Sequence, residues 1–260
     1  MTEIALFILL LFGITWPWGV LVTPAAMSHG QWIFLAAFLP MVWMPTFIAL
    51  SLTRYTQDAE AVRRELGVRL SVRRGWGIVL LAGATPLLIG AVALGVARAV
   101  GDGAPFIPSS ALLTSIVIQV ISGSTGEELG WRGFLLPRLR SRIGATGGAV
   151  VMGLLWASWH VPAFYTPGMP HRFMPMGPML TLIALFGVFL AALFYRAGDS
   201  VLPTMAAHIS LNVVLGIGGV NLASFAFWMT MVVLTAPVAL VSMVWSTARQ
   251  RDLTDERVVA

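Results

Sequence analysis

Two adjacent glutamates, Glu127 and Glu128, stand inside an apolar segment of the chain, residues 111–131. A charged side chain near the centre of a membrane helix costs about 2.5–3.5 kcal/mol on insertion scales. Neighbouring carboxylates also repel each other, so the pair requires a partner or a function. Arg132 is a partner for Glu128, because residues i and i+4 lie on the same helix face. Glu127 points about 100° away and is left without one.

Two further apolar segments carry polar side chains at helical spacing. His160 follows Trp156 by four residues, and Asn212 follows His208 by four. An imidazole can hold a water molecule, an amide can donate to a developing oxyanion, and a carboxylate in a site of low polarity can accept a proton from water. The chain has no cysteine. These residue types therefore predict hydrolysis by an activated water, without a serine or cysteine nucleophile.

A zinc site is the alternative use of the same side chains. Two histidines and a glutamate bind Zn²⁺ in peptidases, and the ligands here would be Glu127, His160 and His208. The HExxH pattern that places such ligands on one helix is absent from the sequence. A glutamate-dependent mechanism and one that uses a divalent metal such as zinc both remain open at this point.

The composition indicates the surroundings of these residues. Hydrophobic residues make up 58% of the 260 residues and charged residues only 10%, with a mean hydropathy of +0.86. Soluble domains typically carry about 25% charged residues. So few polar groups cannot cover a soluble globule, and a disordered chain or a nucleic-acid-binding arm is excluded. The chain is expected to lie in a bilayer.

The polar residues must then be positioned by membrane-spanning helices, which need about 20 apolar residues each. The predicted fold is all-α, a polytopic membrane protein with a single bundle of about eight transmembrane helices. The expected spans are 4–22, 32–52, 76–97, 111–131, 147–165, 179–195, 201–219 and 223–246. In this single domain, residues 1–110 hold the first three helices and 111–219 the motif-bearing ones. Residues 220–260 form the last helix and a tail.

Basic residues predict the orientation. When the eight spans alternate across the membrane, all of the 16 basic residues except Arg98 and Arg172 fall on one side. The positive-inside rule then puts both termini in the cytoplasm, and the protein in the cytoplasmic membrane. The longest cytoplasmic connection, 53–75, is expected to be a solvated loop, with an amphipathic helix at the anionic leaflet as the alternative.

The depth of the polar residues predicts one shared site. With a rise of about 1.5 Å per residue, the glutamates, His160 and His208 lie at compatible depths toward the cytoplasmic side. They would line one water-filled pocket open to the cytoplasm, if the helices tilt or the glutamate-bearing helix breaks at Gly123 or Gly126.

Three short motifs together resemble a known family. Glu127-Glu128-x-x-x-Arg132 resembles the EExxxR motif, His160 the histidine of the FxxxH motif, and His208-x-x-x-Asn212 the HxxxN motif. These are the motifs of the CAAX-protease and bacteriocin-processing family, also called CPBP or Abi, of intramembrane endopeptidases. The resemblance covers residues 123–212. Its one departure is Trp156, which stands where the second motif has Phe.

The resemblance implies a role for each matched residue. Glu127 would be the general base that activates water, and His160 would help to position that water. His208 and Asn212 would stabilise the oxyanion. Glu128 belongs to the catalytic set through its motif, supported by Arg132 and Trp156.

The resemblance also implies a CAAX prenyl endopeptidase-like enzyme that cleaves a peptide bond near the cytoplasmic face. The family includes the eukaryotic enzyme that removes the last three residues of prenylated CAAX proteins. The expected partners are membrane lipid and a peptide or protein substrate, lipidated or not, and no nucleic acid.

Two functions of other classes use the same residues. Intramembrane Glu and His serve as proton relays in transporters, so a proton-coupled transporter is one alternative. Transporters often consist of two related halves, and no counterpart of the glutamate segment appears in this sequence. The other alternative is a non-catalytic scaffold or immunity protein of the same fold. The intact motifs favour the peptidase over both.

Overall fold

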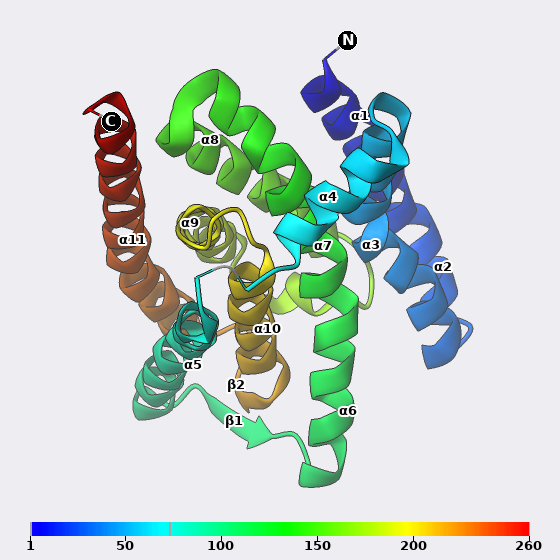
Figure 1. Ribbon diagram of the computed structural model, residues 1–260. Helices are drawn as coiled ribbons and strands as arrows, with labels where there is room; N and C mark the ends of the chain where they lie inside the picture. The colour runs from blue at the N-terminus through cyan, green and yellow to red at the C-terminus, as the bar shows by residue number, and fades with distance from the viewer. Residues whose placement is uncertain (1, 73, 260) are drawn as a thin grey trace.

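The computed structural model describes residues 2–72 and 74–259 as a bundle of helices with one two-stranded sheet (Figure 1). The α-helices are α1 (Glu3–Pro17), α2 (Thr23–Met27), α3 (Gln31–Thr56), α4 (Ala59–Arg69), α5 (Trp76–Ala99), α6 (Ser109–Gln119), α7 (Thr125–Glu128), α8 (Leu136–Trp159), α9 (Met176–Arg196), α10 (Leu202–Gly216) and α11 (Phe225–Val259). Three stretches are π-helical: η1 (Trp18–Val22), η2 (Val120–Ser124) and η3 (Leu129–Leu135). Two are 3₁₀-helical: η4 (Val161–Phe164) and η5 (Pro170–Phe173). Strand β1 (Gly103–Phe106) pairs antiparallel with β2 (Gly218–Val220).

The predicted all-α polytopic membrane fold is confirmed. Among the described residues, six helices are long and apolar enough to span a membrane: Glu3–Met27, Trp32–Thr56, Trp76–Ala99, Thr125–Phe164, Met176–Arg196 and Phe225–Ser246. Ser109–Gln119 and Leu202–Gly216 are shorter apolar helices, and with them the eight predicted segments are accounted for. The seventh is shorter than predicted, because α10 has 15 residues and so extends about 22 Å.

Large apolar side chains cover the outside of the bundle, as a lipid environment requires. Leu80, Leu113 and Leu240 are 71%, 72% and 66% exposed. A soluble monomer does not expose apolar surface of this extent. The interior is one cluster of buried side chains that reaches from α1 to α11.

The glutamate-bearing helix does not break at Gly123 or Gly126, which was one of the two ways, besides helix tilt, in which the polar residues could share a pocket. Instead, the π-helical stretches η2 and η3 lie on either side of α7. Each π-turn inserts a residue into the helix and frees backbone carbonyls. Two of these find partners, since Thr125 Oγ1 donates to Val120 O (2.7 Å) and Trp43 Nε1 donates to Ile121 O (2.9 Å). The π-turns therefore redirect the side chains of α7 while the helix continues.

The chain reverses later, inside α8. Ile143 has φ −128° and ψ 15°, and Gly144 has φ 76° and ψ 171°. A positive φ suits glycine, because a side chain there would clash with the backbone. The segments predicted as the fourth and fifth spans are thus joined by a sharp turn at Gly144.

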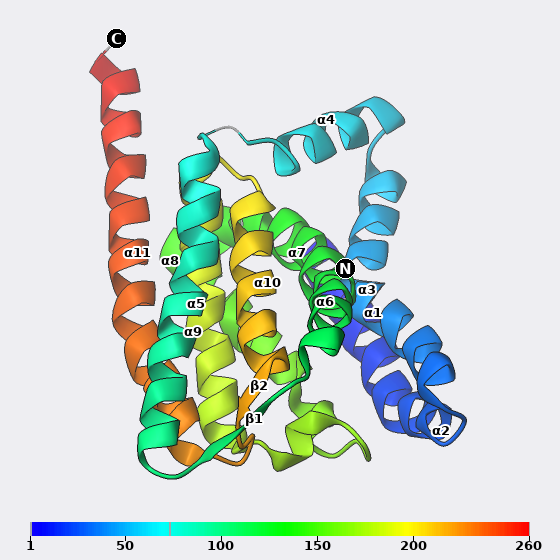
Figure 2. The same cartoon turned by 90° about the horizontal axis from the view of Figure 1, so that it is seen from below.

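The two ends of the bundle differ in charge. Figure 2 shows α4 and the C-terminal end of α11 at one end, and β1, β2 and α2 at the other. At the first end, Arg140 donates to both carboxylate oxygens of Asp199 (2.9 and 2.7 Å), and Arg69 Nη1 donates to the Asp199 carbonyl (3.2 Å). We call this the arginine-rich end. Arg73 and the side chains of Arg249, Arg251 and Arg257 lie outside the described residues.

Residues 53–75 were expected to form a solvated loop, but the structure has a helix there, α4. The Asp58 carboxylate caps α4 by accepting from Ala61 N (2.7 Å). The side chain of Arg69, at the last residue of α4, is mostly buried and pairs with Glu65 and Asp199. These contacts tie α4 to the connection between α9 and α10.

Helices α8 and α9 pack closely at paired glycines. A Cβ atom added at Gly153 would lie 2.5 Å from Ala184 O, whereas one at Gly95 in α5 meets nothing within 4 Å. Gly153→Ala is expected to lower the thermal unfolding midpoint in detergent micelles, because overpacking costs about 1–3 kcal/mol. The control, Gly95→Ala, should keep or raise the midpoint, because Ala favours a helix by about 1 kcal/mol. Equal midpoints for the two variants would contradict the α8–α9 packing.

Candidate active site

The carboxylate of Glu128 is paired with an arginine inside the protein. Arg132 Nη1 donates to Glu128 Oε1 (2.8 Å), and the side chains of both residues are 0% exposed. This is the predicted i, i+4 pair. The same oxygen lies 2.9 Å from His208 Nδ1, so it also joins α7 to α10. Because a carboxylate accepts, Nδ1 is the nitrogen that carries the hydrogen, and Nε2 of His208 is left for another partner.

Glu127 has a different environment, although it is the next residue. Its Oε2 accepts a hydrogen bond from the indole Nε1 of Trp156 (2.8 Å), which links α7 to α8. The Trp156 ring also lies 4.2 Å from the guanidinium carbon of Arg132, a cation–π distance. A phenylalanine, which the family motif has at this position, could pack in the same way but could not donate to Glu127.

The ring of His160 is oriented by the end of α8. Its Nδ1 lies 2.8 Å from Trp156 O, and a carbonyl can only accept, so Nδ1 is the donor. The ring stands edge-on to Trp156 and Trp159, with centroid distances of 5.4 and 5.2 Å. Nε2 is therefore free to accept a hydrogen bond from a water molecule.

Gly123 is the position at which the site residues converge. A Cβ atom added there would lie 2.6 Å from Asn212 Nδ2 and 3.8 Å from both Glu127 Oε1 and His208 Nε2. Any other residue at position 123 would crowd the asparagine amide. The sequence pointed to Gly123 only as a possible helix break. Its place four residues before Glu127, on the same helix face, was the signal for a role in the site.

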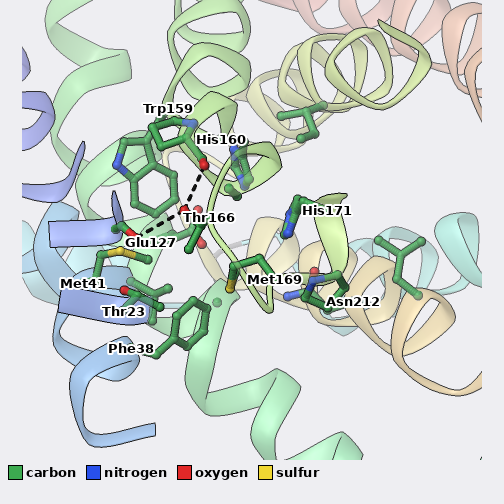
Figure 3. A pocket seen from close by; sticks show the side chains of 18 of the residues that line it. Thr23, Phe38, Met41, Glu127, Trp159, His160, Thr166, Met169, His171 and Asn212 are labelled. Carbon is green, nitrogen blue, oxygen red and sulfur yellow. Dashed lines mark hydrogen bonds between the residues drawn. The ribbon is translucent and has the colours of Figure 1, made fainter. Parts of the chain in front are cut away.

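These groups line one cavity of about 510 Å³ (Figure 3). Five of the seven predicted residues lie on its wall: Glu127, Trp156, His160, His208 and Asn212. The other two, Glu128 and Arg132, form the buried pair behind it. Most of the remaining wall is apolar and includes Phe38, Met41 and Met169. Sequence reasoning missed His171, which also lines the cavity, because its segment was read as an ordinary loop.

The predicted metal ligands do not form a metal-binding group in this arrangement. Within the described residues, no cluster of three or more His, Cys, Asp or Glu side chains could hold a metal ion. Glu127 Oε2 is engaged by Trp156, and His208 Nδ1 by Glu128. In this arrangement, the set Glu127, His160 and His208 therefore does not fit a metal ion.

The site defines a class of protein, a polytopic helical membrane protein with a largely apolar cavity that has a carboxylate on its wall. The model of a protein family described as type II CAAX prenyl endopeptidase Rce1-like matches residues 109–214, which include all three motifs. A curated relative from Methanococcus maripaludis, named CAAX prenyl protease 2, is 32% identical over 50 residues. That match covers 19% of this chain and 18% of the relative.

The resemblance predicted from the motifs is confirmed by these matches. The similarity lies in residues 109–214, the part of the chain that carries the three motifs. The family also agrees with the several apolar helices of a multi-pass membrane protein.

The buried pair should matter for stability as well as for the site. Arg132→Met leaves Glu128 as an uncompensated buried charge, which is expected to cost about 3–5 kcal/mol. Unfolding in detergent micelles should show a large loss for this variant. The double variant Arg132→Met with Glu128→Gln should recover much of it, because the stranded charge is gone.

The matched control is Arg64→Met, which removes an exposed i, i+4 partner of Glu60. Exposed pairs contribute little, so its unfolding midpoint should equal that of the unmodified protein. A single variant Arg132→Met as stable as the double variant would show that Glu128 does not depend on the arginine.

Proposed function

We propose that the protein is an intramembrane endopeptidase in which Glu127 activates a water molecule. The observation that carries this proposal is the division of labour between adjacent glutamates. Glu128 is held by Arg132 and His208 away from the cavity, whereas Glu127 lies on the cavity wall with His160 and Asn212. The carboxylate of Glu127 thus shares a largely apolar cavity with two hydrogen-bonding groups, the imidazole of His160 and the amide of Asn212.

The hydrolysis follows from these positions. Nε2 of His160 accepts a hydrogen bond from the water, and Glu127 takes the other water proton as the oxygen attacks the carbonyl carbon of the peptide bond. The amide of Asn212 donates to the resulting oxyanion, and His208 is a second donor when Nε2 carries a proton. Glu127 then gives its proton to the amine as the C–N bond breaks. The second water proton leaves the new carboxylic acid for the amine, so the products are a carboxylate and an ammonium group.

Trp156, Glu128 and Arg132 support this chemistry without touching the substrate. The indole N–H of Trp156 holds one oxygen of Glu127, so the other oxygen is directed toward the cavity. Glu128 fixes the ring of His208 through Nδ1. The arginine keeps Glu128 ionised and in place.

The substrate proposed is a peptide or protein segment, with membrane lipid as the surroundings. An apolar cavity of this size accepts several residues of an extended or lipid-bearing chain. Whether the substrate carries a lipid, and whether a divalent metal such as zinc assists, are arms of the experiment below.

Glu127→Gln is expected to reduce cleavage by at least about 10²-fold, because the amide cannot accept the water proton. Purified protein in micelles would be incubated with lipidated and unlipidated peptide libraries, with and without a chelator, and the products identified by mass spectrometry. Glu60→Gln, which changes an exposed carboxylate on α4, is the control and should cleave like the unmodified protein.

The outcomes separate the alternatives. Cleavage by Glu127→Gln at the unmodified rate would overturn the role of this residue. Glu127-dependent ion flux in proteoliposomes without cleavage would indicate a transporter. Full cellular function in Glu127→Gln would indicate a scaffold or immunity protein. Loss of cleavage on chelation would assign a metal to the reaction.

The position of the cavity bears on the side of cleavage. Its wall is formed by the C-terminal ends of α1 and α8, η1, the first halves of α3 and α9, α6 to α7, η4, η5 and the second half of α10. In Figure 2, the second half of α10 lies toward the end that carries β1 and β2, whereas α6 and α7 lie near the middle of the bundle. With both termini in the cytoplasm, as the arginines predict, the half that carries β1 and β2 is the extracytoplasmic half. We therefore propose access from that half, in place of the cytoplasmic opening predicted from helix counting.

Because the chain has no cysteine, single cysteines can test this orientation. Tyr165 is 66% exposed in the 160–176 segment, and Tyr55 is 90% exposed beside α4. Tyr165→Cys should react with a membrane-impermeant maleimide in intact spheroplasts, whereas Tyr55→Cys should react only after permeabilisation. Met174→Cys, on the cavity wall, should lose cleavage when it is modified from the outside. The reverse labelling pattern would return the site to the cytoplasmic side.

A further inference from the structure

His171 is an ionisable residue on the cavity wall that the mechanism above does not use. It lies in η5, within the segment that connects α8 to α9, eleven residues beyond His160. Its ring centroid is 6.3 Å from that of His160 and 5.7 Å from that of Phe164, against which it stands edge-on. Figure 3 shows the ring at the cavity, on the same side as Asn212 and Met169.

The segment that carries His171 is held against the rest of the wall. Thr166 Oγ1 lies 2.9 Å from Pro162 O and 3.2 Å from Gly19 O, and the second contact brings the segment against η1. The N–H of Arg172 donates to Met169 O (3.2 Å), which closes the turn of η5. The position of the imidazole is therefore set by the fold.

One nitrogen of this imidazole lacks a partner. Nδ1 of His171 is buried and has no hydrogen bond among the described residues. Leaving such a group unsatisfied costs about 1–3 kcal/mol. Burial also lowers the pKa of His171 from 6.5 to about 4, so the ring is uncharged at neutral pH. The ring is thus uncharged and lies on the cavity wall with one nitrogen unsatisfied, and a rotation of the imidazole about its Cβ–Cγ bond would turn this nitrogen toward a molecule in the cavity.

We propose that His171 is a substrate-binding residue whose Nδ1 forms a hydrogen bond with a backbone peptide group of the bound polypeptide. This inference rests on the proposed peptidase function. A peptide group is neutral and has one donor and one acceptor, as the uncharged imidazole does, whereas a carboxylate would call for a cation. The proximity to His160 places this contact beside the attacking water, so His171 would hold the polypeptide across the reaction centre.

The test uses three variants that separate shape from hydrogen bonding. His171→Phe keeps an aromatic ring against Phe164 but removes both nitrogens. His171→Asn returns a polar atom close to the position of Nδ1, and His171→Gln returns one close to Nε2. KM and kcat would be measured with a peptide that the unmodified protein cleaves. His29→Phe, an exposed histidine bonded within its own turn, is the control.

His171→Phe is expected to raise KM about tenfold and to change kcat little, because a hydrogen bond present in both ground and transition states is lost. His171→Asn should recover most of the loss, and His171→Gln should not. The control should behave like the unmodified protein. An unchanged KM in His171→Phe, or equal losses in the Phe and Asn variants together with a lower unfolding midpoint, would overturn the proposal and leave a packing role.

A binding experiment distinguishes failure of this inference from failure of the proposed function. The Kd of the same peptide, labelled with a fluorophore, would be measured for Glu127→Gln and for Glu127→Gln with His171→Phe. A weaker Kd in the double variant supports the contact by His171 even if Glu127 is not the base. Equal Kd values would overturn it even if Glu127→Gln abolishes cleavage.

Discussion

The ion pair of Glu128 and Arg132 is the interaction on which the arrangement of the site depends. Both side chains are fully buried, where water cannot solvate either charge, so each requires the other. The carboxylate that accepts from Arg132 also accepts from His208, and the guanidinium stacks on Trp156. One buried pair thus connects α7, η3, α8 and α10. Because Arg132 and His208 both hold Oε1 of Glu128 and the side chain is fully buried, Glu128 does not reach the cavity, and Glu127 is the carboxylate on the cavity wall.

Trp156 connects the buried pair to Glu127 and holds its carboxylate in place. Its ring lies between the cation of Arg132 and the imidazoles of His160 and His208, which stand edge-on to it, and its N–H donates to Glu127. The phenylalanine of the family motif would supply the ring faces but no donor. In this chain, therefore, one oxygen of the Glu127 carboxylate is held, and the contact joins α7 to α8. This difference between the chain and the family motif follows from a single side chain.

The sequence predicted what depends on composition and on spacing along one helix. Apolar length gave the spans, and the i, i+4 rule gave the contact between Glu128 and Arg132. The three motifs gave five residues of one cavity. Helix counting failed where helices are not regular. Three features change the depth of a side chain in the membrane: the π-helical stretches around α7, the reversal at Gly144 and the short α10. The spacing of apolar residues in the sequence predicts none of them. The role of Gly123 and that of His171 were missed for a related reason, since both depend on contacts between segments that are distant in the sequence.

The cavity lies between the three motifs and the segment that follows the histidine of the second motif. This segment runs from residue 161 to residue 176 and includes η5, where His171 lines the same wall as His160. A peptide that approaches Glu127 from this half of the bundle must pass the segment, so its length and polarity influence which peptides enter. The motifs place the carboxylate, the amide and the imidazoles on the cavity wall. In the proposed peptidase, selection among peptides would then depend on this segment, which is separate from the buried pair of Glu128 and Arg132.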